Sequence, residues 1–163
     1  MHLEFTHRFA APPPAVVAMY ADEEFARRRA LATGATDSDV LIDGGPDEAF
    51  TSAIRRVTPT EGIRADMRGL VGPTIVVNYT ESWSEPEGDA RDATFAVDIV
   101  GVPARAAGTI TVTPEGEGSL LVVDGTVSST AFLVGAAVSK AVGEALEAAI
   151  EREFAAADEW LAR

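Results

Sequence analysis

Four polar side chains fall on predicted inward faces, and they limit the chemistry that this sequence could support. His7 and Glu153 could act as a general acid or base, and His7 could instead anchor a ligand or be a hydrogen-bonded core histidine. Tyr79 suits an amphipathic pocket wall, whereas Glu81 could equally face solvent at a sheet edge. Glu153 falls near the centre of an apolar helix face, where a carboxylate must pair, reach water or hold a proton.

Other kinds of functional site are not indicated. The sequence has no cysteine and two histidines, which leaves no disulfide, no thiolate metal site and no histidine-rich metal centre. It has no Ser/His/Asp set, no glycine-rich phosphate loop and no metal-ligand spacing, so we expect no cofactor and no metal, and catalysis is unsupported.

The charge distribution argues against nucleic acid and anionic membranes as partners, because the net charge is −13. Arg27, Arg28 and Arg29 form one basic cluster, but on a helix they point in three directions, so we expect them to be solvated. Residues 131–138 form the longest apolar run, which is too short for a stable membrane insertion. The N-terminus lacks the apolar core of a signal peptide, and the sequence therefore predicts a cytoplasmic protein.

The last third of the chain, residues 130–163, has the apolar periodicity of one long amphipathic helix. Its apolar face is small over the first two-thirds, where alanines dominate, and becomes bulky only with Ile150, Phe154 and Trp160. Small residues that face a sheet permit either a close approach of the helix or a hollow between helix and sheet. The strands supply more apolar surface than this helix face can fill, which keeps the hollow as an alternative.

Seven segments before that helix alternate apolar and polar residues as strands do, namely residues 3–9, 39–43, 49–58, 74–84, 93–102, 104–113 and 119–129. Two short helices follow the first strand, one over residues 15–21 and one that Asp22 caps and that ends near Gly34. Residues 59–73 contain three glycines and are predicted to form a flexible loop with at most one helical turn. The pattern predicts an α+β domain spanning residues 1–163, in which a curved antiparallel seven-stranded sheet wraps around the long C-terminal helix.

This order of elements resembles the helix-grip fold of the START-like (SRPBCC) superfamily, which includes birch-pollen-allergen-type proteins, polyketide cyclases and lipid-transfer domains. Short motifs are similar to an actinobacterial family of uncharacterised function within it: FTHRF (5–9) followed by APP (11–13), TESW (80–83), FLVG (132–135) and EWL (159–161). The resemblance implies an apolar ligand held between sheet and helix, and it implies no particular chemistry, because some members catalyse and many do not.

The sequence therefore predicts a non-catalytic binding or carrier protein for a small apolar or amphipathic molecule. A cyclase- or hydratase-like enzyme that uses His7 or Glu153 is one alternative, and an interaction module with a filled core is another. The residues expected to line the cavity are Phe5, His7, Phe9, Ile75, Val77, Tyr79, Trp83, Phe95, Val97, Ile99, Ile110, Val112, Leu121, Val123, Val138, Val142, Ala145, Ala149 and Glu153. Ile63, Met67 and Leu70 are expected to form a mobile lid over one entrance.

Overall fold

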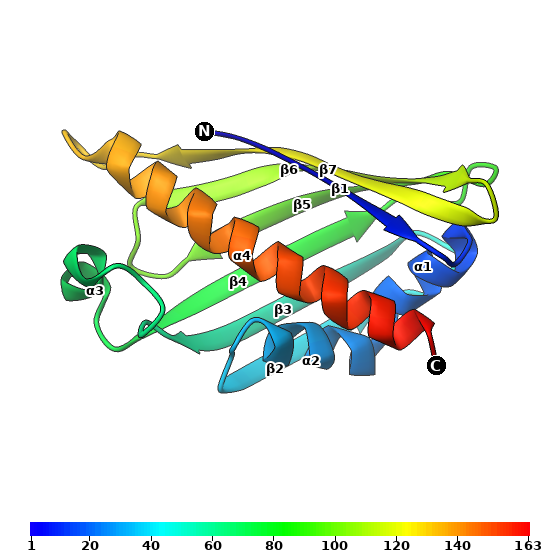
Figure 1. Ribbon diagram of the computed structural model, residues 1–163, viewed down its shortest axis with the longest axis horizontal. Coiled ribbons are helices and arrows are strands. Elements are labelled where there is room, and N and C mark those ends of the chain that lie inside the picture. The colour runs from blue at the N-terminus through cyan, green and yellow to red at the C-terminus, as the bar shows by residue number, and fades with distance from the viewer.

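An antiparallel sheet of seven strands curves around one long helix in the computed structural model (Figure 1). The structure describes residues 1–163, apart from the side chain of Leu70. The elements are β1 (His2–Phe9), α1 (Pro13–Tyr20), α2 (Glu23–Ala32), β2 (Asp37–Asp43), β3 (Phe50–Pro59), α3 (Ala65–Val71), β4 (Thr74–Trp83), β5 (Arg91–Ile99), β6 (Ala104–Glu115), β7 (Gly118–Ser129) and α4 (Gly135–Leu161). Strands β2 to β7 form a meander, and β1 pairs with β7 at one edge. The predicted helix-grip α+β fold is confirmed.

The two short helices begin where local chemistry favours them. Pro13 occupies the first turn of α1, where the missing proline N–H removes no helical hydrogen bond. The Asp22 carboxylate caps α2 by accepting the N–H groups of Glu24 at 2.8 Å and Phe25 at 3.1 Å. Figure 1 shows α1 and α2 near the C-terminal half of α4 and α3 near its N-terminal half.

The C-terminal helix begins at Gly135, later than the sequence predicts. The Thr130 N–H donates to the Pro103 carbonyl at 3.0 Å, and the Ser129 hydroxyl accepts the N–H of Ala131 at 3.1 Å, so these residues are held by the β5–β6 turn and by a local bond. Leu133 then has a φ of 64°, which no right-handed helix contains. The 27 residues of α4 extend over about 40 Å, less than the sequence suggested.

The segment between β3 and β4 is more ordered than predicted. It contains α3, which spans about two turns rather than one at most. Thr60 closes the base of the segment, because its N–H donates to Pro73 at 3.0 Å and its hydroxyl donates to Gly72 at 2.6 Å. These bonds hold the ends of the segment together, which allows the residues between them to form a helix despite Gly69. None of the described helices combines the length and apolar character needed to cross a membrane.

One glycine allows an aromatic ring to pack on the inner face of the sheet. A Cβ atom at Gly125 of β7 would lie 2.7 Å from Cζ of Phe95, so any larger residue would displace that ring. Phe95 is buried, and it extends from β5 toward the space beneath α4. Side-chain packing above the sheet therefore sets the size of the space that remains under the helix.

Candidate ligand-binding site

Two hollows lie between α4 and the sheet. The inner cavity has a volume of about 40 Å³, and its walls are largely apolar. The outer pocket has a volume of about 310 Å³ and opens beside residues 59–63. Arg56, Leu146 and Ala149 line both spaces, so the two hollows are neighbours that share part of one wall.

The inner cavity is small because side chains from both sides reach into it. Tyr20 of α1, Arg29 of α2 and Leu146 of α4 all contribute to its wall. The sequence suggested one hollow under the helix, and the structure divides that space into a small interior cavity and a larger open pocket. Arg56 of β3 and Leu146 of α4 stand at the boundary, because both side chains border both spaces.

The residues predicted to line one cavity are distributed over several places. Those at the inner cavity are Tyr79, Phe95, Val97, Ile110, Leu121, Val123, Ala149 and Glu153. Those at the outer pocket are Ile63, Ile75, Val77, Ile99, Val142, Ala145 and Ala149. Period-two counting identified the inner face of the sheet, and the path of α4 across that face decides which hollow each residue meets.

Some predicted lining residues meet neither hollow, which corrects the sequence-based set. Phe9, Trp83, Val112 and Val138 are buried in the filled part of the core. Phe5 and His7 instead line a groove on the outside, between the edge strand β1 and α4. Met67 packs against the core, and the side chain of Leu70 lies outside the described part of the chain.

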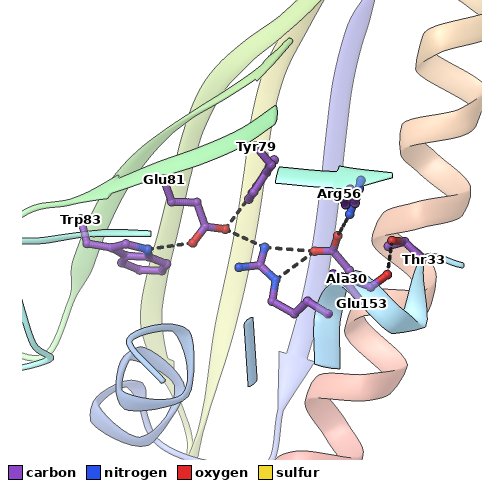
Figure 2. Close-up of polar contacts among 8 residues, drawn as sticks. Ala30, Thr33, Arg56, Tyr79, Glu81, Trp83 and Glu153 are labelled. Atoms are coloured by element: carbon purple, nitrogen blue, oxygen red, sulfur yellow. Dashed lines mark hydrogen bonds and ion pairs between the residues drawn. The ribbon is translucent and has the colours of Figure 1, made fainter. Parts of the chain in front are cut away.

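A network of buried charges forms the polar end of the inner cavity (Figure 2). Arg29 donates from Nη2 to Oε1 of Glu81 at 2.7 Å, and from Nε and Nη2 to Oε2 of Glu153 at 3.2 and 3.0 Å. Arg56 donates from Nη1 to the other oxygen of Glu153 at 3.1 Å. Arg29 is 3% exposed and Glu81 is 0% exposed, so groups of opposite charge meet in the interior. Each carboxylate is thereby compensated, as burial of a charge requires.

Strand geometry brings two further donors to Glu81. Tyr79, Glu81 and Trp83 alternate along β4, so their side chains lie on one face of the sheet. The Tyr79 hydroxyl donates to Oε1 of Glu81 at 2.7 Å, and the indole N–H of Trp83 donates to Oε2 at 3.0 Å. Figure 2 shows both side chains turned toward the carboxylate between them. Glu81 is therefore inward-facing and fully hydrogen-bonded, which answers the question left open by the sequence.

Aromatic rings enclose the central guanidinium. The Cζ atom of Arg29 lies 4.9 Å from the centre of the Tyr20 ring and 5.1 Å from that of Tyr79. Burial opposes a charge on Arg29, but Glu81 and Glu153 outweigh it and raise the pKa well above its ordinary value. Burial also raises the pKa of Tyr79 well above its ordinary value, and Glu81 adds to this effect while Arg29 opposes it. Tyr79 is consequently a protonated donor at neutral pH.

The two predicted acid–base residues occupy different environments. The Nε2 atom of His7 lies 3.0 and 3.1 Å from the two carboxylate oxygens of Asp158, and its ring stacks on Phe154 with centres 4.5 Å apart. Both oxygens of Glu153 accept from guanidinium groups in the interior. Within the described residues, His7 lines the outer groove and Glu153 the inner cavity, so they do not act on one bound molecule from opposite sides.

Sequence reasoning missed both arginines of the network. Arg29 was expected to be solvated like Arg27 and Arg28, yet it lies four residues after Phe25 on the buried face of α2. Arg56 continues the alternation of buried residues along β3. The sequence did contain one sign of this network. Four charged residues, two of each sign, fall on the inward faces of four different elements.

The curved sheet around α4 is a START-like helix-grip fold, and solved structures show the same architecture. TTHA0849 from Thermus thermophilus superposes with a TM-score of 0.67 at 19% identity, covering 99% of this chain and 97% of that one. A START superfamily protein from Mycobacterium smegmatis has a TM-score of 0.59 at 15% identity, with 98% of each chain covered. The Zhui aromatase/cyclase from Streptomyces sp. R1128 has a TM-score of 0.55 at 18% identity, covering 99% of this chain and 90% of that one.

The chain belongs to a family described as proteins of unknown function, DUF2505, whose model matches residues 4–161. No curated protein matches the sequence. The predicted membership of an uncharacterised family is therefore confirmed, and so is the predicted START-like fold. At these low identities the solved structures establish the fold and leave the ligand to be argued from the site itself.

Proposed function

We propose that this protein binds or carries a small amphipathic molecule between its sheet and α4. The observation that supports this most directly is the outer pocket of about 310 Å³. Hollows of this volume, with mostly apolar walls and few polar groups, are typical of small-molecule sites. The fold is shared with a START superfamily protein and an aromatase/cyclase, which is consistent with an internal ligand.

The small side chains of α4 create the room for such a molecule. Ala145 and Ala149 line the pocket on the helix side, opposite Ile75 and Val77 of β4. Larger residues at the two alanine positions would fill this space, because the strands already present branched side chains to it. The helix sequence thus supplies the volume and the strands supply the apolar surface.

The segment between β3 and β4 lies at the mouth of the pocket and is the proposed entrance. Ile63 lines the opening, together with Glu61 and Gly62. Met67 and Leu70 follow on α3 and stay part of the predicted lid. A ligand that enters here would pass between this segment and the alanine face of α4.

The contacts of the candidate acid–base residues favour binding without catalysis. Glu81 and Glu153 already accept hydrogen bonds from arginine, tyrosine or tryptophan on both oxygens. Their oxygens are therefore already engaged by donors of the protein itself. His7, paired with Asp158, faces a different groove.

The decisive experiment fills the pocket from the helix side. Wild type should bind the neutral fluorescent probe N-phenyl-1-naphthylamine, and Ala145→Leu should weaken that binding by about tenfold or more, because the new side chain occupies probe volume. Ala145 faces open space, so the free energy of unfolding should stay within about 0.5 kcal/mol of wild type. Ala137→Leu, at an exposed position on the same helix, is the matched control and should bind as wild type. Absence of probe binding to wild type, or equal binding by both variants, would show that the pocket is not a ligand site.

A further inference from the structure

The Arg29 guanidinium has one buried nitrogen without a partner. Its Nε and Nη2 atoms donate to Glu81 and Glu153, whereas Nη1 is enclosed and has no hydrogen-bond partner among the described residues. Arg29 is 3% exposed, so bulk water does not reach this group. Buried N–H groups are rarely left unsatisfied, because their desolvation is then uncompensated. An unpaired donor in an otherwise paired network indicates that a further acceptor belongs there.

The inner cavity beside Arg29 is the space in which such an acceptor could lie. Arg29 lines the inner cavity, and the remaining wall is mainly apolar, with Leu3, Val97, Ile110 and Leu121 among its residues. A cavity of about 40 Å³ holds a water molecule or a small end group such as a hydroxyl or an acetyl oxygen, and it does not hold a ring system. The adjoining outer pocket, at about 310 Å³, is the space for a larger apolar body.

The outer pocket also contains a buried donor without a partner, in this case a hydroxyl group. The hydroxyl of Thr58 is buried, lines the outer pocket and has no partner among the described residues. Each hollow therefore contains a buried polar atom without a partner, and the wall of the outer pocket also includes Glu61 and Arg152. This combination matches a molecule with few polar groups on an apolar frame.

We propose that the ligand enters polar end first, so that a neutral carbonyl or hydroxyl oxygen occupies the inner cavity and accepts a hydrogen bond from Nη1 of Arg29. The apolar body of the ligand then fills the outer pocket between α4 and β4, and the side chains of Arg56 and Leu146, which border both spaces, move apart to admit it. This inference rests on the proposed function and adds the chemical class of the ligand. An oxygen that replaces a bound water keeps the hydrogen bond, whereas an apolar group of the same shape loses it.

The charge balance of the network favours a neutral oxygen over a carboxylate. Arg29 and Arg56 supply two positive charges, and Glu81 and Glu153 supply two negative charges. An anionic end group would therefore add an uncompensated charge beside two buried carboxylates. Burial and like charges both disfavour that arrangement.

The test uses three ligands that share one ring system. They are 2-acetylnaphthalene, its isostere 2-isopropenylnaphthalene, which replaces the carbonyl oxygen by a methylene, and 2-naphthoate. Dissociation constants are measured by competition with N-phenyl-1-naphthylamine, on wild type, Arg29→Lys and the control Arg28→Lys, whose arginine is exposed on the same helix. The ratio of two ligands' dissociation constants is compared between variants, because a change that affects all ligands equally does not alter this ratio.

We expect the preference for the ketone over its isostere to fall by about tenfold in Arg29→Lys and to stay unchanged in Arg28→Lys. Naphthoate should bind wild type least tightly. Equal preference in wild type and Arg29→Lys would overturn this inference and leave the proposed function standing, and so would a failure of all three compounds to compete with the bound probe. Absence of binding by the probe itself would overturn both. If Arg29→Lys does not fold, the dissociation constants of wild type decide the question. The inference is overturned if naphthoate binds most tightly. It is also overturned if the ketone binds no more tightly than its isostere once their different free energies of transfer from water are subtracted.

Discussion

At the scale of single residues, the interior of this protein depends on four charges that compensate one another. Arg29 and Arg56 share Glu153, and Arg29 also pairs with Glu81. Such a network adds little stability relative to well-packed apolar residues, because desolvation offsets the attraction. Loss of one member is different, since the remaining charges stay buried without a partner.

Glu153→Ala is therefore expected to lower the free energy of unfolding by about 3–5 kcal/mol, because it leaves the buried guanidinium of Arg56 without a carboxylate and Arg29 with Glu81 alone. Urea denaturation followed by circular dichroism measures this change. Glu151→Ala, an exposed acidic position on the same helix, is the control and should change stability by less than about 0.5 kcal/mol. A Glu153→Ala variant as stable as its control would mean that water or another carboxylate compensates both arginines.

The two tyrosines predict a loss of stability at alkaline pH. Burial raises the pKa of both Tyr20 and Tyr79 above the ordinary value of 10.0. The folded protein thus keeps protons that the unfolded chain releases, so stability is complete below about pH 10 and decreases above it, by up to about 1.4 kcal/mol per pH unit for each tyrosine. Urea unfolding between about pH 8 and pH 11 measures the slope. Tyr79→Phe should reduce that slope by about half, and an unchanged slope would contradict burial of its hydroxyl.

At the scale of elements, α4 has two differently built halves. Its N-terminal half carries the alanines that border the outer pocket, whereas its C-terminal half carries rings that pack on the sheet and on α2. Phe154 stacks on His7, and Trp160 lies against Phe25 with ring centres 5.4 Å apart. The helix is therefore anchored at its C-terminal end and borders open space toward its beginning.

Trp160→Ala is expected to lower the free energy of unfolding by about 2–3 kcal/mol. This is less than the roughly 3–5 kcal/mol for a fully buried ring, because Trp160 is only partly buried. Guanidinium chloride denaturation measures the change, and Glu159→Ala at the exposed neighbouring position is the control. Equal midpoints for the two variants would show that the end of α4 is not docked against α2.

At the scale of the whole molecule, contacts between distant parts of the chain connect the sheet to the helices around α4. Arg29 of α2 joins β4 and α4 through carboxylates that are 52 and 124 residues away in the chain. Proteins of this size with one continuous core generally unfold as a unit. Equilibrium unfolding therefore tests the predicted single domain over residues 1–163.

We expect one cooperative unfolding transition. Trp83 in β4 and Trp160 in α4 are the two tryptophans, so Trp160→Phe and Trp83→Phe each leave one fluorescent reporter in the sheet or in the helix. Within each variant, the fluorescence and far-ultraviolet circular dichroism curves should coincide, because sheet and helix lose their structure together. A fluorescence midpoint displaced from the circular dichroism midpoint in either variant would indicate parts that unfold separately.

The strands, the short helices α1 and α2 and the antiparallel meander could all be predicted from the amino-acid sequence. These features depend on residues close together in the chain: the alternation in β1 and β4, the proline at the start of α1 and the cap of Asp22 on α2. Local patterns of this kind carry their information within a few positions. The inward position of Glu153 followed from the same periodicity.

The construction of the site, in contrast, emerged only with the three-dimensional arrangement. Arg29 and Arg56 acquire their partners from β4 and α4, and the local pattern places each arginine on a buried face without identifying the carboxylate that it meets. The start of α4 depends on the bond between Thr130 and Pro103, and the division of the hollow depends on Arg56 of β3 and Leu146 of α4, which border both spaces. The physical reason is the same in each case: burial, pairing and cavity volume arise where distant segments meet, so a period counted along one segment does not contain them.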